Sequence, residues 1–155
     1  MTTFDSRAFV DDLDRAIVRA LSGDGRMSYT DLGKLTGLST SAVHHRVRRL
    51  EQRGVLRGYR AVVDATSLGL PLTAFISLTP LDQRAPDDIP VRLEDLVEVE
   101  AIHAVAGEAN YMIKVRVASP AILEDLLTTL RQKAGVSTRT TVVLSTPYED
   151  RPPRI

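Results

Sequence analysis

Cysteine and tryptophan are both absent from this sequence of 155 residues, and only 5% of its residues are aromatic. Without cysteine the chain can form neither disulfides nor thiolate metal sites, so a reducing cytoplasm is the expected location. The shortage of aromatic side chains disfavours a carbohydrate-binding or aromatic-cage protein. No apolar stretch approaches the roughly 20 residues of a membrane helix, and no basic segment followed by an apolar run opens the chain, so neither a membrane span nor a secretory signal is expected.

A net charge is also lacking, because 20 Lys and Arg balance 20 Asp and Glu, but the charges are unevenly distributed. Residues 1–60 hold 11 basic and 7 acidic side chains, whereas residues 61–155 hold 9 and 13. The bias is strongest over 39–60, which carries six arginines and a single acid, Glu51. Such a segment fits a polyanionic partner, although a solvated basic helix face would have the same composition.

The first third of the chain has the apolar spacing of three helices. The first begins at Asp11 and ends at a pair of glycines, and the second spans 28–37. The third spans 41–53 after an N-cap at Ser39 or Thr40. Its apolar positions are four and then three residues apart, which predicts one buried seam formed by Val43, Val47 and Leu50.

A short helix, a glycine-containing turn and a basic third helix form a helix-turn-helix pattern. If the seam points inward, the hydrogen-bonding side chains of the third helix face outward, where they suit base edges and phosphates. The predicted DNA contacts are Ser39, Thr40, Ser41, His44, His45, Arg46, Arg48 and Arg49. Among these, Arg46 and Arg49 are assigned to phosphate contacts or to structural ion pairs rather than to bases. A helical protein–protein module with a basic helix is the alternative.

The rest of the chain changes to strand patterns interrupted by two helical ones. Val55–Asp64 predicts a strand or wing, followed by a connector. Beyond it, the expected elements are strands over 73–79, 97–105, 110–118 and 137–145 and helices over 86–96 and 120–135. This order predicts an α+β fold with a winged helix-turn-helix domain over 1–60, a strand and linker over 61–72, and a ferredoxin-like βαββαβ domain over 73–155.

The predicted sheet has four antiparallel strands with both helices on one face. Alternate residues of the strands are apolar, so the open face requires a cover. A second copy of the chain is the simplest cover, and the sequence therefore predicts a homodimer.

No arrangement of residues typical of catalysis or metal binding is found in the sequence. His44 and His45 are adjacent and cannot face one another on a helix, and neither a nucleophile elbow nor a phosphate-binding glycine loop is present. Neither an enzyme nor a cofactor is therefore expected. The turn Gly107–Tyr111 and the Thr-rich last strand fit either a small-molecule site or a polar hairpin beside an exposed strand face.

Three segments together resemble the Lrp/AsnC, or feast/famine, family of transcriptional regulators. They are Leu13–Asp64, the glycine turn VAGEANYMIKVRV and the last strand GVSTRTTVVL. The resemblance implies a sequence-specific DNA-binding regulator, homodimers that commonly assemble into octamers, and an amino-acid effector bound between dimers. Carried over to this chain, the implied effector site consists of Gly107, Glu108, Ala109, Asn110, Tyr111, Thr138, Thr140 and Thr141.

Two residues of the turn depart from the family pattern, which is often acidic–aromatic–acidic. Ala109 stands in place of the aromatic residue, and Asn110 in place of the second acid, so a second carboxylate for an α-ammonium group is missing. This departure leaves a second hypothesis, an effector-independent, nucleoid-associated architectural DNA binder. A third is an enzyme or metabolite-binding module whose helices dock a protein.

Overall fold

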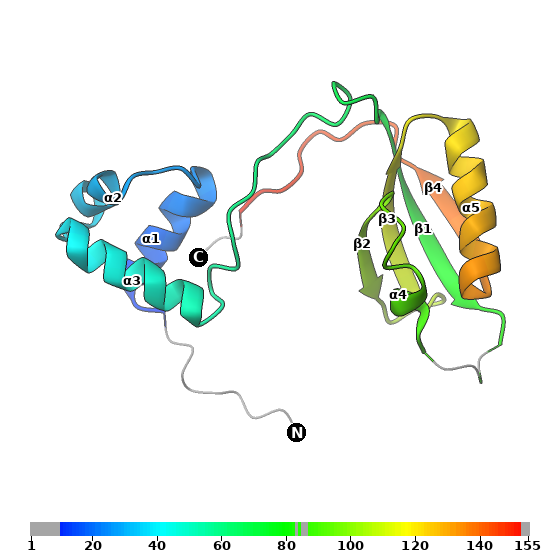
Figure 1. The fold of residues 1–155 in the computed structure, drawn as a ribbon, viewed down its shortest axis with the longest axis horizontal. Coiled ribbons are helices and arrows are strands. Elements are labelled where there is room, and N and C mark those ends of the chain that lie inside the picture. Colours follow the sequence, from blue (N-terminus) through cyan, green and yellow to red (C-terminus); the bar gives the residue numbers. More distant parts are fainter. Residues whose placement is uncertain (1–9, 83, 85–86, 153–155) are drawn as a thin grey trace. The chain divides into compact units, whose positions relative to one another are not determined.

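The structure, a computed structural model, describes residues 10–82, 84 and 87–152. These residues form two compact units (Figure 1): the first extends to Val62 and takes in the tail from Tyr148, and the second spans Val63–Pro147. Each unit has its own buried apolar core. Within the described part of the chain, every helix is too short or too polar to cross a membrane.

Three helices make up the first unit: α1 (Asp12–Gly23), α2 (Tyr29–Thr36) and α3 (Thr40–Gln52). Each begins after a side chain that accepts a backbone N–H of the first turn, which satisfies one of the donors left without a helical partner. These caps are Asp11, Ser28 and Ser39. The predicted positions of all three helices are confirmed to within a residue or two.

One apolar cluster holds the three helices together. It consists of Ile17, Leu21, Leu32, Val43, Val47 and Leu50. The predicted seam of α3 is confirmed, since its three apolar side chains are fully buried. Gly33 of α2 allows the turn before α3 to come close, because a Cβ at this position would lie 2.7 Å from the Leu38 carbonyl oxygen.

The strand or wing predicted for Val55–Asp64 is wrong, because the structure forms no strand there. Two backbone N–H groups of the segment donate to the Leu50 carbonyl, and the Tyr59 hydroxyl donates to the Glu51 carboxylate at 3.0 Å. Burial, together with the Glu51 carboxylate, raises the pKa of Tyr59 to about 12. Further along, Val62 is 82% exposed. A segment rich in Val, Leu and Tyr forms a strand only where a second strand supplies hydrogen bonds, and no described strand lies beside this segment.

The second unit is a four-stranded antiparallel sheet with two helices (Figure 1). Its elements are β1 (Leu72–Pro80), α4 (Ile89–Arg92), β2 (Val99–Ala104), β3 (Tyr111–Val117), α5 (Pro120–Ala134) and β4 (Val136–Val142). The strands lie in the order β2-β3-β1-β4. This is the split βαβ arrangement, so the predicted fold is confirmed.

Helix α4 is shorter than the helix predicted for 86–96, of which residue 86 lies outside the described residues. Pro90 occupies its first turn, where a missing N–H is tolerated, and proline disfavours helical backbone in the residue before it. After Leu93 the chain continues in turns, in which the Leu96 N–H donates to the Leu93 carbonyl. One turn of helix therefore remains.

The sheet has one covered and one open face. Side chains of both helices share a single buried cluster with alternate residues of the strands, such as Ile76 and Ile113. The residues between them point to the open face, where Phe75 and Met112 are partly exposed. There the Glu100 carboxylate pairs with Lys114 at 3.0 Å and with Arg116 at 2.6 Å.

Candidate DNA-binding helix and ligand pocket

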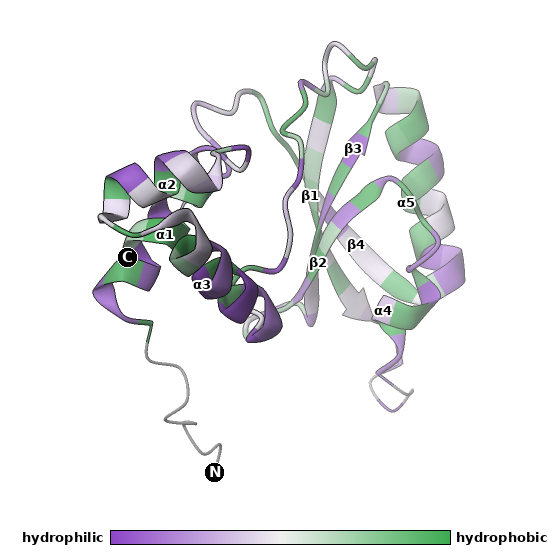
Figure 2. Cartoon of the chain, turned by 60° about the vertical axis from the view of Figure 1, so that its left-hand side comes forward, coloured by the Kyte–Doolittle hydropathy of each residue, from purple (hydrophilic) through white to green (hydrophobic). Residues whose placement is uncertain are grey.

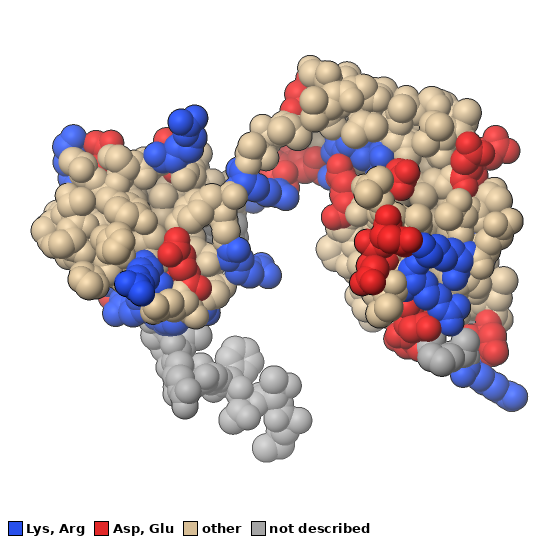
Figure 3. All heavy atoms as spheres, viewed as in Figure 1, with Lys and Arg blue, Asp and Glu red and all other residues tan. Residues whose placement is uncertain are grey.

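The outer surface of α3 carries most of the side chains predicted to contact DNA. Ser39, Thr40, Ser41, His44, His45, Arg48 and Arg49 are exposed, whereas Arg46 is half-buried. Figure 2 shows the hydrophilic stretch of α3 in purple, and Figure 3 shows blue Lys and Arg side chains with red acidic ones among them along the same helix. The buried seam thus leaves a continuous polar face outward.

Two histidines occupy the N-terminal half of this face. The ring of His44 meets the ring of Tyr29 of α2 edge-on, with centroids 5.5 Å apart, and the His45 ring lies 6.1 Å from that of His44. Arg48 follows on the same face and makes no ion pair with any described residue. These groups can donate or accept hydrogen bonds at base edges.

Arg46 and Arg49 are held by acids of α1. The Asp14 carboxylate accepts from Arg46 Nη1 at 2.7 Å and from Arg49 Nη2 at 2.8 Å. Asp11, the N-cap of α1, accepts from Arg46 Nη1 at 2.6 Å. The bond to Asp11 contributes most to raising the pKa of Arg46, and the same bond lowers that of Asp11. Of the two roles that the sequence leaves open for Arg46, the structure shows the ion pair.

A hollow of about 520 Å³ lies at the turn end of the open face of the sheet. It is lined by the β2–β3 turn and by parts of β1, β3 and β4, including Ser77, Thr79, Val105, Gly107, Glu108, Ala109, Met112, Thr138 and Arg139. Glu108 and Arg139 form an ion pair across it at 3.1 Å, with side chains 87% and 80% exposed. An ion pair this exposed contributes little stability and separates readily.

The predicted effector residues do not form one cluster. Gly107, Glu108 and Ala109 line the hollow together, but Tyr111 is buried and donates to Asp87 at 2.6 Å. This bond raises the pKa of Tyr111.

The strand register divides the threonines of β4. Thr138 and Thr140 lie opposite Leu78 and Ile76, which places them on the covered side, and Thr138 accepts from Arg131 of α5 at 3.0 Å. Thr141, opposite Phe75, lies on the open face.

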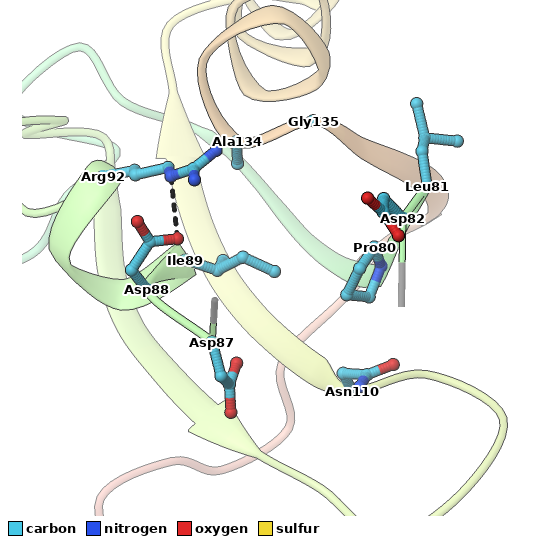
Figure 4. A pocket seen from close by; sticks show the side chains of 10 residues that line it. All are labelled: Pro80, Leu81, Asp82, Asp87, Asp88, Ile89, Arg92, Asn110, Ala134 and Gly135. Atoms are coloured by element: carbon cyan, nitrogen blue, oxygen red, sulfur yellow. Dashed lines mark ion pairs between the residues drawn. The ribbon is translucent and has the colours of Figure 1, made fainter. Parts of the chain in front are cut away.

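Asn110 lines a different hollow, of about 630 Å³, shown in Figure 4. Its other walls come from α4, the end of β1 and the end of α5. Arg92 and Asp88 of this hollow pair at 2.8 Å. Ala109 and Asn110 are adjacent in the sequence, but they line two separate hollows.

Sequence reasoning missed Met112, Ser77 and Thr79 as pocket residues, and it noted Arg139 only as one of the polar residues of the last strand, outside the implied effector site. The available signal was strand alternation, since Ser77 pairs with both Arg139 and Met112 in the register. Opposite residues of antiparallel strands share a face, so all three lie on the open side. Without the register, the polar residues of the last strand could not be assigned to a face.

Comparison with known proteins covers both units. Residues 10–51 match the AsnC-type helix-turn-helix domain, and residues 73–153 match the Lrp/AsnC ligand binding domain. The HTH-type transcriptional regulator LrpA of Mycobacterium tuberculosis is 51% identical over 142 residues, 92% of this chain and 95% of that protein. The leucine-responsive regulatory protein of Escherichia coli K12 is 37% identical, over 87% of this chain and 85% of that protein.

A solved structure of a feast or famine regulatory protein from M. tuberculosis, complexed with L-methionine, superposes with a TM-score of 0.91. It is 51% identical and covers 93% of this chain and 98% of its own. Both domain models and both relatives belong to the same family, and the relatives are named as regulators rather than enzymes. The chain belongs to the Lrp/AsnC family of DNA-binding transcriptional regulators.

Proposed function

We propose that α3 is the recognition helix of this regulator and that its exposed polar face enters the major groove. Base contacts are assigned to Ser39, Thr40, Ser41, His44, His45 and Arg48. Arg49 is assigned to a phosphate, because its side chain is half exposed, and Arg46 to the ion pair with α1. The division of α3 into a fully buried seam and an exposed hydrogen-bonding face carries the proposal.

Replacement of Arg48 tests this assignment. A duplex enriched by the wild-type chain from a random-sequence pool serves as the specific probe, and the unselected pool as the non-specific one. Arg48→Ala is expected to weaken binding to the enriched duplex roughly tenfold or more at fixed salt, because a base contact is worth about 1–3 kcal/mol. Arg26→Ala removes the same charge on the α1–α2 turn and serves as the control. Equal affinities of Arg48→Ala and Arg26→Ala in fluorescence anisotropy would contradict the assignment.

We propose that the hollow beside the β2–β3 turn binds an amino-acid effector. Glu108 offers a carboxylate to an α-ammonium group, and Arg139 offers a guanidinium to an α-carboxylate. Met112 and Ala109 supply the apolar surface for a side chain. The related M. tuberculosis protein that was solved with L-methionine supports this ligand class. Of the residues first implied by the family resemblance, Gly107, Glu108 and Ala109 belong to this proposed site. Thr138 also borders the hollow, but its hydroxyl is bonded to Arg131 on the covered side and is not assigned to the ligand. Asn110, Tyr111, Thr140 and Thr141 do not line it.

Calorimetry against the twenty proteinogenic amino acids, beginning with L-methionine, tests the effector. Glu108→Gln and Arg139→Gln are each expected to weaken the observed binding at least about tenfold, because a charge-assisted pair is lost. Arg92→Gln, which changes the other hollow, is expected to leave binding unchanged. Binding lost only in Arg92→Gln would move the site to that hollow. No heat with any amino acid would favour the effector-independent architectural binder.

A homodimer that assembles further into an octamer is the proposed form of the regulator, bound to the nucleoid. In it, residues 1–60 contact DNA, 61–72 link the domains, and 73–155 bind the effector and the other subunits. The open sheet face, on which Phe75 is partly exposed outside the effector hollow, supports its use as the dimer interface.

A further inference from the structure

Asp14 is the one charged or polar residue that is fully buried in the described part of the chain. Only 1% of the Asp14 side-chain surface is exposed, and the carboxylate contacts the guanidinium groups of Arg46 and Arg49, which lie on successive turns of α3. A buried carboxylate is costly unless it is paired. Each of its two oxygens accepts from a different arginine, so removing either arginine would leave one buried oxygen without its partner. The pairing is therefore an obligatory part of the packing between α1 and α3.

The same contacts determine which positive charges of α3 are available to DNA. Of the six arginines in 39–60, Arg46 donates hydrogen bonds to two acids and Arg49 to one, and Arg49 also forms a longer ion pair with Asp11 at 3.9 Å. A phosphate could recruit Arg46 only in competition with carboxylates at 2.6 and 2.7 Å. Contacts to phosphate raise affinity for every sequence alike, whereas base contacts discriminate between sequences.

We propose that Asp14 is a positioning residue for DNA sequence discrimination. It fixes the rotation of α3 against α1, which points the polar face at the bases, and it keeps Arg46 away from phosphates. The consequence is a lower affinity for random DNA relative to the operator. This inference rests on the proposed role of α3 as the recognition helix.

The experiment compares the wild-type chain with Asp14→Asn and with Asp12→Asn as a matched control. Asp12 lies in the same first turn, is exposed and makes no ion pair with a described residue, so both variants lose one negative charge. Affinity for the enriched duplex and for the unselected pool is measured by anisotropy over a series of KCl concentrations. Circular dichroism of each full-length variant monitors folding.

For Asp14→Asn, affinity for the unselected pool is expected to rise at low salt, and the slope of log K against log[KCl] to steepen by roughly 1 per chain, because the one additional phosphate contact, from Arg46, contributes about 0.9. The ratio of specific to non-specific affinity is expected to fall about tenfold. Asp12→Asn is expected to keep the wild-type ratio.

Equal weakening on both DNAs with an unchanged salt slope would reduce Asp14 to a structural role and overturn the inference, as would a ratio equal to that of Asp12→Asn. If Asp14→Asn does not fold, Asp11→Asn replaces it, since asparagine still caps α1. This variant removes one of the two acids bonded to Arg46 and the longer ion pair of Arg49 at 3.9 Å, and leaves both bonds to Asp14 in place. It is expected to lower the ratio by roughly half or more, and a ratio equal to that of Asp12→Asn overturns the inference. Failure of the wild-type chain to enrich any duplex would instead refute the recognition role of α3.

Discussion

At Gly33 the absence of a side chain determines how closely α2 and the turn before α3 can approach. The atom nearest to a built Cβ is a backbone oxygen, that of Leu38, whose amide also donates to the Gly33 carbonyl. Backbone held in this way cannot move aside as the end of a flexible side chain can. The angle at which α3 leaves the turn therefore depends on this glycine.

Gly33→Ala is expected to destabilise the chain by about 1–3 kcal/mol, since the contact would force the turn open and outweigh the better helix propensity of alanine. Gly23→Ala, at the end of α1, meets no atom within 4 Å and is expected to stabilise it by about 0.5 kcal/mol. Urea unfolding followed by circular dichroism measures both. An equal shift of the two midpoints would show that the close contact at Gly33 has no energetic consequence.

At the scale of elements, local patterns were sufficient to predict what depends on local physics. Apolar spacing predicted the seam of α3, caps predicted the helix starts, and alternation predicted the four strands. Composition failed where the outcome depends on a partner, because Val55–Asp64 is rich in Val, Leu and Tyr but has no neighbouring strand. The length of α4 is a local matter, since Pro90 in its first turn sets where the helix begins within the predicted segment.

The candidate sites show the same division. The outward face of α3 follows from its seam, so its polar residues could be predicted from the sequence. The pairing of Arg46 with Asp14 joins residues 32 positions apart, and no periodicity indicates it. The placement of Thr138 and Arg139 on opposite sides of β4 depends on which residues of β1 they face. Long-range contacts and strand register were therefore the missing information.

At the scale of the whole molecule, each of the two units has an exposed surface that no other described element of that unit covers. The helical unit has a polar, arginine-containing face, and the sheet unit has a face without helices that exposes Phe75 and Met112. The first fits a polyanion, and the second fits a partner that covers Phe75 and Met112. A two-fold dimer of the proposed kind would present two copies of α3 at once, so covering the second surface would also strengthen binding at the first.

Phe75→Glu is expected to break the proposed dimer, because it places a carboxylate in the centre of the open face on both copies and brings like charges together across a two-fold axis. Val97→Glu introduces the same charge at a side chain that is 91% exposed and should leave assembly unchanged. Sedimentation over a range of protein concentrations measures both. A mass shift for Phe75→Glu alone places the subunit contact on the open face, and it should be accompanied by weaker DNA binding, since the two helices would then bind independently. An unchanged mass for Phe75→Glu would require the subunit contact to be sought elsewhere on the chain.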